Sequence, residues 1–259
     1  MKSKLIMAAA AAAILSAGAA SAIAADAPKG KVAAYITEAV ADKARPEADT
    51  KRDADRKPAE MLAFAGVKPG MTVVDLIPGG GYFTRIFSKA VGPKGTVYAV
   101  GAPPRPVTDP AKPPPTPAQD TIAADPNYAN VKSVHVPFTA LAVPSKADVV
   151  WTSQNYHDLH NVPNLDMAAF DKAVFDALKP GGEFIVLDHR ANPGDPTVTK
   201  TLHRIDPAVV KAEVTAAGFK FEGESTVLKN PADDHTKGIR DGFSQGQTDQ
   251  FIYKFRKPK

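Results

Sequence analysis

A glycine-rich turn is the part of the sequence best suited to bind a ligand. Its residues read Val73-Val74-Asp75-Leu76-Ile77-Pro78-Gly79-Gly80-Gly81-Tyr82-Phe83. The apolar run around Asp75 predicts a strand, and the spacing from Tyr82 onward predicts a helix. Glycines between them let the backbone approach a ligand, and the free N–H groups at the helix start favour a polar or anionic group. A nucleotide-like cofactor is the first hypothesis, although a tight turn alone also needs such glycines.

Histidines and acids gather after two later strands. Four of the six histidines follow apolar runs that predict strands, namely His157, His160, His189 and His203. A neutral imidazole accepts a proton near pH 7, which suits a general base. Three of them (His157, His160, His189), with Asp188 or Asp158, have the chemistry to hold zinc or another divalent ion, but they match no metal signature. Polar loop residues that hydrogen-bond locally are the third interpretation, and the spacing leaves all three open.

Composition excludes several classes of function. The chain has 259 residues, of which 44% are hydrophobic and 23% charged, as is typical of a globular protein. It contains no cysteine, so thiol chemistry, disulfides and cysteine metal ligands are excluded. A formal net charge of +4 is too small to predict a nucleic-acid partner.

Residues 1–25 predict a cleavable secretory signal peptide. Lys2 and Lys4 precede an alanine-rich apolar segment, and small residues follow as far as Ala25. An uncleaved membrane anchor is the alternative, but the composition and the flanking residues favour cleavage. We therefore expect a periplasmic or secreted protein with no stable membrane insertion after cleavage.

Helical and strand patterns alternate along the remaining chain. Residues 26–56 predict an N-terminal helical extension, whose charged stretch at 43–57 is either solvated surface or a cover over the ligand site. Residues 101–117 contain eight prolines and predict an extended loop. Trp151 is expected in the core and Asp233-Asp234-His235 on the solvated surface. Strands are predicted at 72–76, 96–100, 131–136, 147–152, 183–188, 219–228 and 250–255, and helices at 31–42, 58–65, 82–91, 120–128, 166–178 and 207–217.

This order predicts an α/β fold. We expect a Rossmann-like, seven-stranded, mostly parallel sheet with helices on both faces and the last strand antiparallel. In such sheets ligands bind beyond the carboxyl ends of the strands, near the point where the strand order reverses. The glycine turn lies at one of these ends.

With these motifs, residues 57–259 resemble a class I S-adenosylmethionine-dependent methyltransferase domain. The glycine turn after Asp75 is similar to the family's acid-x-Gly-x-Gly-x-Gly motif, and Leu178-Lys-Pro-Gly-Gly182-Glu-Phe-Ile-Val-Leu-Asp188 is typical of its fifth strand. Ala217-Gly-Phe-Lys-Phe and Gln250-Phe-Ile-Tyr-Lys resemble its closing reversed hairpin. Asp55-Arg-Lys-Pro-Ala-Glu and Asn155-Tyr-His-Asp-Leu-His160 resemble an exported bacterial branch of predicted methyltransferases.

The resemblance implies a cofactor and a reaction. The cofactor is S-adenosylmethionine, and the reaction is methyl transfer to a small molecule or an envelope component, catalysed mainly by positioning. The implied cofactor-binding residues are Asp75, Pro78, Gly79, Gly80, Gly81, Phe83, Asn155 and Tyr156. The catalytic candidates, which would shape the acceptor site or deprotonate the acceptor, are His157, His160 and His189. No metal ion is assigned.

Two positions depart from the family pattern. The family's first glycine is Ile77 here, and Gly101 follows the second strand where the family has an acid that holds the ribose hydroxyls. A missing acceptor costs about 1–3 kcal/mol per unpaired buried group. A non-catalytic exported binding protein on the same fold is therefore the alternative function, and a histidine-based metal site is the second alternative.

Overall fold

A computed structural model describes residues 32–104, 111, 114–243 and 247–259. The predicted signal peptide lies outside the described residues, as does most of residues 105–113 in the proline-rich loop. None of the helices in the described ranges combines the length and apolarity that a membrane crossing requires.

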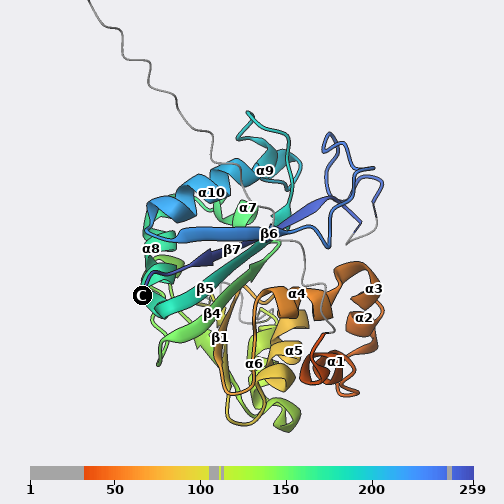
Figure 1. Ribbon diagram of the computed structural model, residues 1–259, viewed down its shortest axis with the longest axis vertical. Helices are drawn as coiled ribbons and strands as arrows, with labels where there is room; N and C mark the ends of the chain where they lie inside the picture. The colour runs from red at the N-terminus through yellow and green to blue at the C-terminus, as the bar shows by residue number, and fades with distance from the viewer. Residues whose placement is uncertain (1–31, 105–110, 112–113, 244–246) are drawn as a thin grey trace, which may run out of the picture.

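A seven-stranded sheet forms the centre of the molecule (Figure 1). Its strand order is β3-β2-β1-β4-β5-β7-β6. The first five strands run parallel, and β7 pairs antiparallel with both β5 and β6. This confirms the predicted Rossmann-like α/β fold and its reversed last strand. The strands are β1 (Thr72–Leu76), β2 (Thr96–Gly101), β3 (Val131–His135), β4 (Ala147–Ser153), β5 (Leu178–His189), β6 (Lys220–Ser225) and β7 (Gln250–Arg256).

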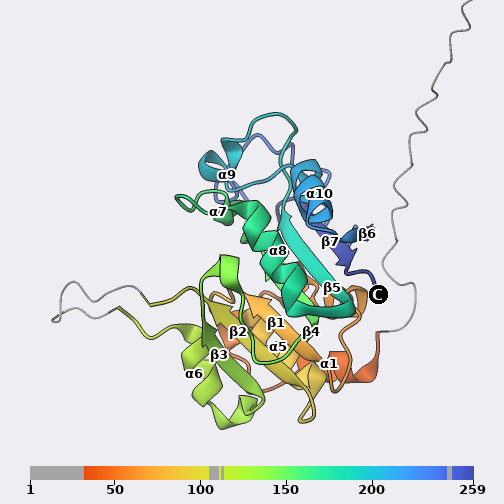
Figure 2. The same cartoon turned by 90° about the vertical axis from the view of Figure 1, so that its left-hand side faces the viewer.

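Helices cover both faces of the sheet (Figures 1 and 2). One core cluster joins one face to α1 (Ala34–Val40), α4 (Pro58–Phe64), α5 (Tyr82–Val91) and α6 (Ala118–Ala124). The other joins the opposite face to α7 (Tyr156–Leu159), α8 (Met167–Ala177) and α10 (Pro207–Ala216). The remaining helices are α2 (Glu47–Thr50), α3 (Asp53–Arg56) and α9 (Val198–Thr201), with short 3-10 turns at Pro126–Tyr128 and Phe138–Ala140.

Side chains alternate between these two core clusters along the inner strands. In β1, Val73 faces the first cluster, whereas Val74 and Leu76 face the second. This is the period-2 alternation of a strand that is buried on both faces. Trp151 in β4 is fully buried against Phe83, so the prediction that it belongs to the core is confirmed.

Two strand boundaries differ from the sequence prediction by more than one residue. β5 begins at Leu178 rather than at residue 183, because Leu178 already pairs with Ala147 before the register shifts to Glu183 opposite Val149. The glycines between them form the irregularity, and Gly181 has a φ of 78°. At the other end of the domain, β6 ends at Ser225 rather than at residue 228.

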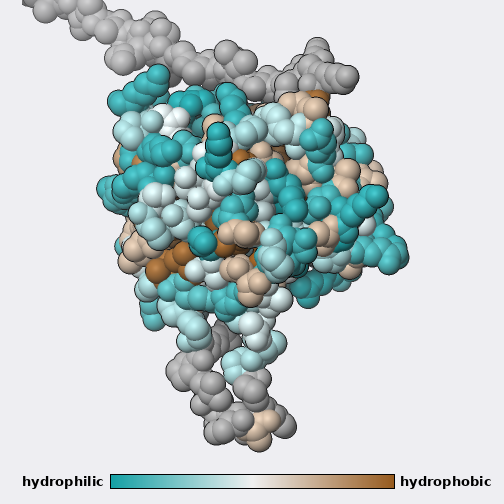
Figure 3. Space-filling model, turned by 90° about the horizontal axis from the view of Figure 1, so that it is seen from below, coloured by the Kyte–Doolittle hydropathy of each residue, from teal (hydrophilic) through white to brown (hydrophobic). Residues whose placement is uncertain are grey.

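Most apolar side chains of the described residues lie in the two core clusters. The face seen in Figure 3 is largely hydrophilic, with one small hydrophobic area. Large hydrophobic side chains that are exposed within the described ranges are Val162 and Val209.

The strand order reverses between β1 and β4, whose carboxyl ends lie side by side. Each of these two strands is followed by a residue in the left-handed region of backbone conformation, namely Ile77 with a φ of 53° and Gln154 with a φ of 60°. The Asn155 side chain then donates to the main-chain oxygens of Ile77, at 3.0 Å, and Leu76, at 3.4 Å. Asn155 therefore ties the end of β4 to the glycine turn.

Candidate functional site

A cavity of about 250 Å³ lies at this reversal point. Its walls come from three places: the end of β1 with the glycine turn, the end of β4, and the N-terminal extension. The lining residues are Asp49, Arg52, Arg56, Asp75, Ile77, Pro78, Gly79, Gly80, Tyr82, Phe83, Ser153, Gln154 and Asn155. This position matches the expected binding edge of a doubly wound sheet.

The glycine turn leaves its backbone open at Gly79 and Gly80 and packed at Gly81. A Cβ atom on Gly80 would meet no atom within 4 Å. At Gly81, which precedes α5 with a φ of 80°, a Cβ atom would lie 2.0 Å from Cδ1 of Ile122. Gly80 therefore leaves room for a ligand, whereas Gly81 is required by the turn and its packing.

Asp75 forms the acidic part of the cavity floor. Its side chain is 3% exposed and accepts a hydrogen bond of 2.6 Å from the Thr84 hydroxyl. Burial raises the pKa of Asp75 to about 7, against the lowering effects of that hydrogen bond and of the Arg56 charge. Near neutral pH this carboxyl is therefore poised between its two protonation states.

Two arginines supply the positive wall. Arg56 donates to the Ser153 hydroxyl at 3.0 Å, and its guanidinium lies 4.4 Å from the centre of the Tyr82 ring. Burial and the neighbouring Arg52 lower the pKa of Arg56 to about 10, so it remains a cation at neutral pH. Neither arginine is ion-paired with a carboxylate in the described ranges, and the buried Nε of Arg52 has no hydrogen-bond partner there.

Specific contacts hold the extension over the cavity. Asp53 accepts from the guanidinium of Arg45 at 2.7 and 2.8 Å and from the Tyr82 hydroxyl at 2.6 Å. Asp49 pairs with Arg85 of α5 at 3.1 Å. The sequence left two interpretations of residues 43–57 open, a cover over the site and a solvated surface. The contacts of Asp49 and Asp53 agree with a cover. Lys51, whose side chain is 71% exposed, is solvated.

A second cluster of polar side chains surrounds Asp188, near the end of β5. This buried carboxylate accepts from the His157 backbone N–H at 2.8 Å, and one of its oxygens lies 2.7 Å from Nδ1 of the same histidine. Burial lowers the pKa of His157, but Asp188 and Asp158 outweigh it and raise the pKa to about 10. Burial lowers the pKa of His189 to about 4 against the raising effect of Asp188, and the His157 charge, whose ring lies 6.0 Å away, lowers it further. His157 is therefore charged and His189 neutral near pH 7.

His160 lies apart from these two histidines. Its Nε2 is 3.1 Å from Glu213, and it lines a separate cavity of about 250 Å³ with Val198, Ile205 and Val209. Tyr156 is fully buried, and its hydroxyl lies within hydrogen-bond distance of Asp171, at 2.9 Å, and of Glu213, at 3.0 Å. This hydroxyl is therefore committed to a polar cluster among α7, α8 and α10.

The structure separates the predicted site residues into groups. Those that line the first cavity are Asp75, Pro78, Gly79, Gly80, Phe83 and Asn155. Gly81 and Tyr156 are packed beside it. Of the histidines, His157 and His189 meet around Asp188, and His160 lies beside Glu213.

Sequence reasoning missed the three polar residues from the extension, Asp49, Arg52 and Arg56. A run of paired charges is equally compatible with a solvated surface and with a cover over a site, so the sequence pattern could not assign these residues to the cavity. Gly101, the other unusual position, is covered by a side chain. A Cβ atom there would lie 2.1 Å from Nε2 of Gln119, which is 7% exposed. An amide thus occupies the space next to the end of β2.

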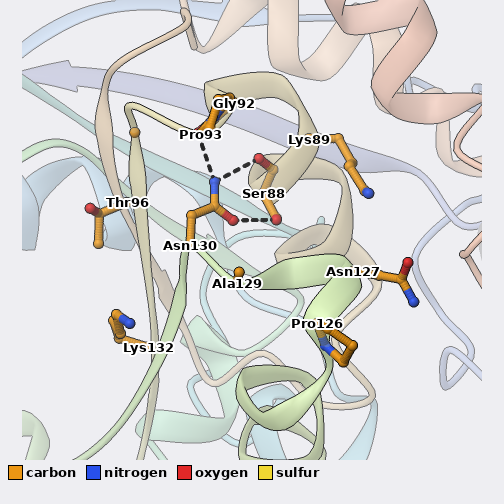
Figure 4. A pocket seen from close by; sticks show the side chains of 11 residues that line it. Ser88, Lys89, Gly92, Pro93, Thr96, Pro126, Asn127, Ala129, Asn130 and Lys132 are labelled. Carbon is orange, nitrogen blue, oxygen red and sulfur yellow. Dashed lines mark hydrogen bonds between the residues drawn. The ribbon is translucent and has the colours of Figure 1, made fainter.

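A larger cavity, of about 490 Å³, lies away from these residues (Figure 4). Its walls include Thr96 and Lys132 near the amino ends of β2 and β3 and the end of α5. Asn130 donates there to the main-chain oxygens of Ser88 at 2.9 Å and Gly92 at 2.8 Å. These bonds join the loop before β3 to α5, so we assign this cavity a structural role.

Comparisons with known proteins establish the fold. No protein-family model and no curated protein matches the sequence. A SAM-dependent methyltransferase from Aquifex aeolicus is 18% identical with a TM-score of 0.57, covering 81% of this chain and 95% of that one. An arsenic(III) S-adenosylmethionine methyltransferase from Chlamydomonas reinhardtii is 18% identical, with a TM-score of 0.52 and coverage of 87% and 73%. A glycopeptide N-methyltransferase complexed with S-adenosyl-L-methionine is 15% identical, with a TM-score of 0.51 and coverage of 78% and 87%.

Proposed function

We propose that this protein is an S-adenosylmethionine-dependent methyltransferase. The observation that carries the proposal is the cavity between the ends of β1 and β4, which is lined both by two arginines that have no carboxylate ion pair in the described ranges and by an open glycine backbone. The position of the cavity in a methyltransferase-like fold agrees with it. When bound, the cofactor supplies an electrophilic methyl group on a sulfonium centre.

The residues of the cavity fit the methionine end of this cofactor. That end carries a carboxylate and an ammonium group. Arg52 and Arg56 offer charge-assisted hydrogen bonds to the carboxylate, and Asp75 offers an acceptor to the ammonium group. Gly80 leaves the space that a larger side chain would fill. These residues bind and orient the cofactor, while Asn155 and Phe83 fix the surrounding walls.

The acceptor is proposed to be a small molecule or an envelope component bound beyond the ends of β4 and β5. We assign proton acceptance to His160, because Glu213 orients its ring and the ring borders a cavity with apolar walls. His157 and His189 shape the floor around Asp188. Catalysis then rests mainly on holding the acceptor in line with the methyl group.

Calorimetry with S-adenosylmethionine and S-adenosylhomocysteine tests the cofactor assignment. The mature protein is expected to bind both, and Gly80→Val is expected to weaken binding at least tenfold because its side chain enters the cavity. The variant's melting temperature serves as the control, since Gly80 has no left-handed φ and no close neighbour. No binding by folded wild-type protein would sink the proposal, as would unchanged affinity in Gly80→Val.

A non-catalytic binding protein that kept the methyltransferase-like fold and lost the cofactor is the second candidate, which the position of Gln119 over Gly101 favours. The two candidates separate when the protein is incubated with methyl-labelled cofactor and an envelope extract. Label that appears in the extract with wild type and is lost with His160→Gln supports methyl transfer. Folded wild-type protein that transfers no label supports the second candidate.

We also propose export to the periplasm or beyond, on the pattern of residues 1–25. Cell fractionation and N-terminal sequencing of the mature protein test this. A new terminus near Ala25 is expected. Recovery of the intact chain from the cytoplasm contradicts export.

A further inference from the structure

Three potential metal ligands converge beside the methyltransferase-like cavity. Nε2 of His157 lies 3.3 Å from Oδ1 of Asp158, and Nδ1 of His203 lies 3.4 Å from the same oxygen. The ligand atoms of all three residues lie within 4.8 Å of one another. His157 and Asp158 belong to α7, which begins directly after Asn155 of the cavity wall, whereas His203 comes from the segment after α9.

These separations suit a four-coordinate ion. Zinc binds imidazole nitrogens and carboxylate oxygens at about 2.0–2.2 Å in tetrahedral geometry, which places neighbouring donor atoms about 3.3–3.5 Å apart. The two contacts to Asp158 already have this spacing. A small adjustment of the half-exposed His203 ring would bring the third donor to the same centre.

The buried histidine is already oriented as a ligand, and the bound ion displaces the proton that its Nε2 holds toward Asp158. Nδ1 of His157 lies 2.7 Å from Asp188, and the backbone N–H of His157 donates to the other oxygen of that carboxylate. A carboxylate behind the ring is the usual outer support of a metal-bound histidine, because it fixes the ring and directs the other nitrogen at the ion. Asp188 is fully buried and is held in place by these bonds.

The backbone at the third ligand is strained. His203 has a φ of 54°, in a region that few residues other than glycine adopt. Neighbouring main-chain bonds hold it there, since Arg204 donates to the main-chain oxygen of Val198 and Ile239 to that of Leu202. This conformation places the His203 ring beside His157, at 5.6 Å between ring centres.

We propose that His157, Asp158 and His203 bind a divalent transition-metal ion, with Zn²⁺ as the best-matched species. Two imidazole nitrogens and one carboxylate favour zinc and its neighbours over Mg²⁺ or Ca²⁺, which prefer oxygen ligands. The side chains of Asp158 and His203 are 53% and 43% exposed, so the fourth coordination position is open to water or to a ligand. The set differs from the one that sequence spacing suggested, because His160 faces Glu213 and His189 faces Thr248.

Titration of the mature, tag-free protein with Zn²⁺ by calorimetry, without cofactor, tests the site. One ion per chain is expected, and Co²⁺ in its place is expected to give the visible absorption of a four-coordinate ion. His203→Asn tolerates the left-handed backbone and removes the imidazole. This variant and Asp158→Ala are each expected to bind at least tenfold more weakly, which corresponds to about 1.4 kcal/mol.

His235→Asn is the matched control. His235 also has a left-handed φ, of 64°, and its Nε2 lies 2.9 Å from a carboxylate, Asp249, in a different loop. It is expected to bind Zn²⁺ as wild type does. Absence of binding by wild type at about 1 mM Zn²⁺ overturns the proposal, and so does equal affinity in wild type, His203→Asn and Asp158→Ala. Because the titration contains no cofactor, its outcome is independent of the methyltransferase proposal.

Discussion

At the scale of single residues, the cavity is lined by a buried carboxyl group, that of Asp75, and a buried guanidinium group, that of Arg56. Asp75 is held partly protonated near neutral pH, whereas Arg56 keeps its charge without a carboxylate partner within ion-pairing distance among the described residues. A buried cation without a carboxylate partner favours an anionic ligand, because the ligand replaces the water that burial removed. The same side chain stacks on Tyr82, so its position is fixed before any ligand arrives.

Replacing Arg56 is expected to weaken cofactor binding. Arg56→Met keeps most of the packing on Tyr82 but removes the charge. A hydrogen bond to a charged group contributes about 1.5–3 kcal/mol, so calorimetry should show roughly a 10- to 150-fold loss of affinity. Lys51→Met removes a charge from the exposed side of the same segment and should bind as wild type. Equal affinity in Arg56→Met and wild type would show that Arg56 does not bind the carboxylate of the cofactor.

The raised pKa of Asp75 predicts a pH dependence of stability. Its folded pKa, about 7, lies above the unfolded value of about 3.9. The folded state therefore binds the proton more tightly, and this contribution is fully present below about pH 4 and is lost as the pH rises toward 7. In Asp75→Asn that loss should be absent. Urea unfolding of both proteins at pH 4, 5.5 and 7 measures it, and a constant difference between them across this range contradicts the prediction.

At the scale of elements, the short helices α2 and α3 act as one cover attached to α5. They bury little apolar surface of their own, and neither contributes a buried hydrophobic residue. Their attachment rests on polar contacts, chiefly Asp53 with Arg45 and Tyr82. Segments held in this way open more readily than the core, which suits a site that must admit a ligand.

Loosening this attachment is expected to open the cover without unfolding the domain. Asp53→Ala leaves the fully buried Arg45 side chain without its carboxylate. Trypsin should then cleave within residues 43–57 several times faster, and cofactor affinity should fall. Glu47→Ala, which breaks the exposed pair with Lys51, should leave both unchanged. An unchanged cleavage rate in Asp53→Ala would show that the cover is held by other contacts.

At the scale of the whole molecule, a buried ion pair joins two loops that are distant in sequence. Arg204 and Asp233 are both fully buried, with a separation of 2.9 Å. Arg204 also donates to the main-chain oxygens of Arg190 and Lys237. Asp233 accepts from the backbone N–H groups of His235 and Asp249. The prediction that Asp233-Asp234-His235 lies on the solvated surface is confirmed for Asp234, which is exposed, and is wrong for Asp233, whose buried charge these partners satisfy.

Breaking this pair is expected to destabilise the fold strongly. Asp233→Ala leaves the Arg204 charge buried and unpaired, which typically costs about 3–5 kcal/mol. Urea unfolding should show that loss, whereas Asp234→Ala should lie within about 1 kcal/mol of wild type, since its charge is exposed. A loss below about 1 kcal/mol in Asp233→Ala would mean that water reaches Arg204 in the variant.

The sequence by itself determined the sheet, the glycine turn and the position of the cavity. These depend on local signals, since apolar alternation defines β1 and the glycines define the turn into α5. Only the tertiary structure decided which charges are buried. A run such as residues 43–57 has the same pattern whether it is solvated or docked, and its docking depends on Tyr82 and Arg85. The histidines followed the same rule. Sequence spacing grouped His157 with His160. In the folded protein, His157 instead lies beside Asp188 and His203, which come from distant parts of the sequence.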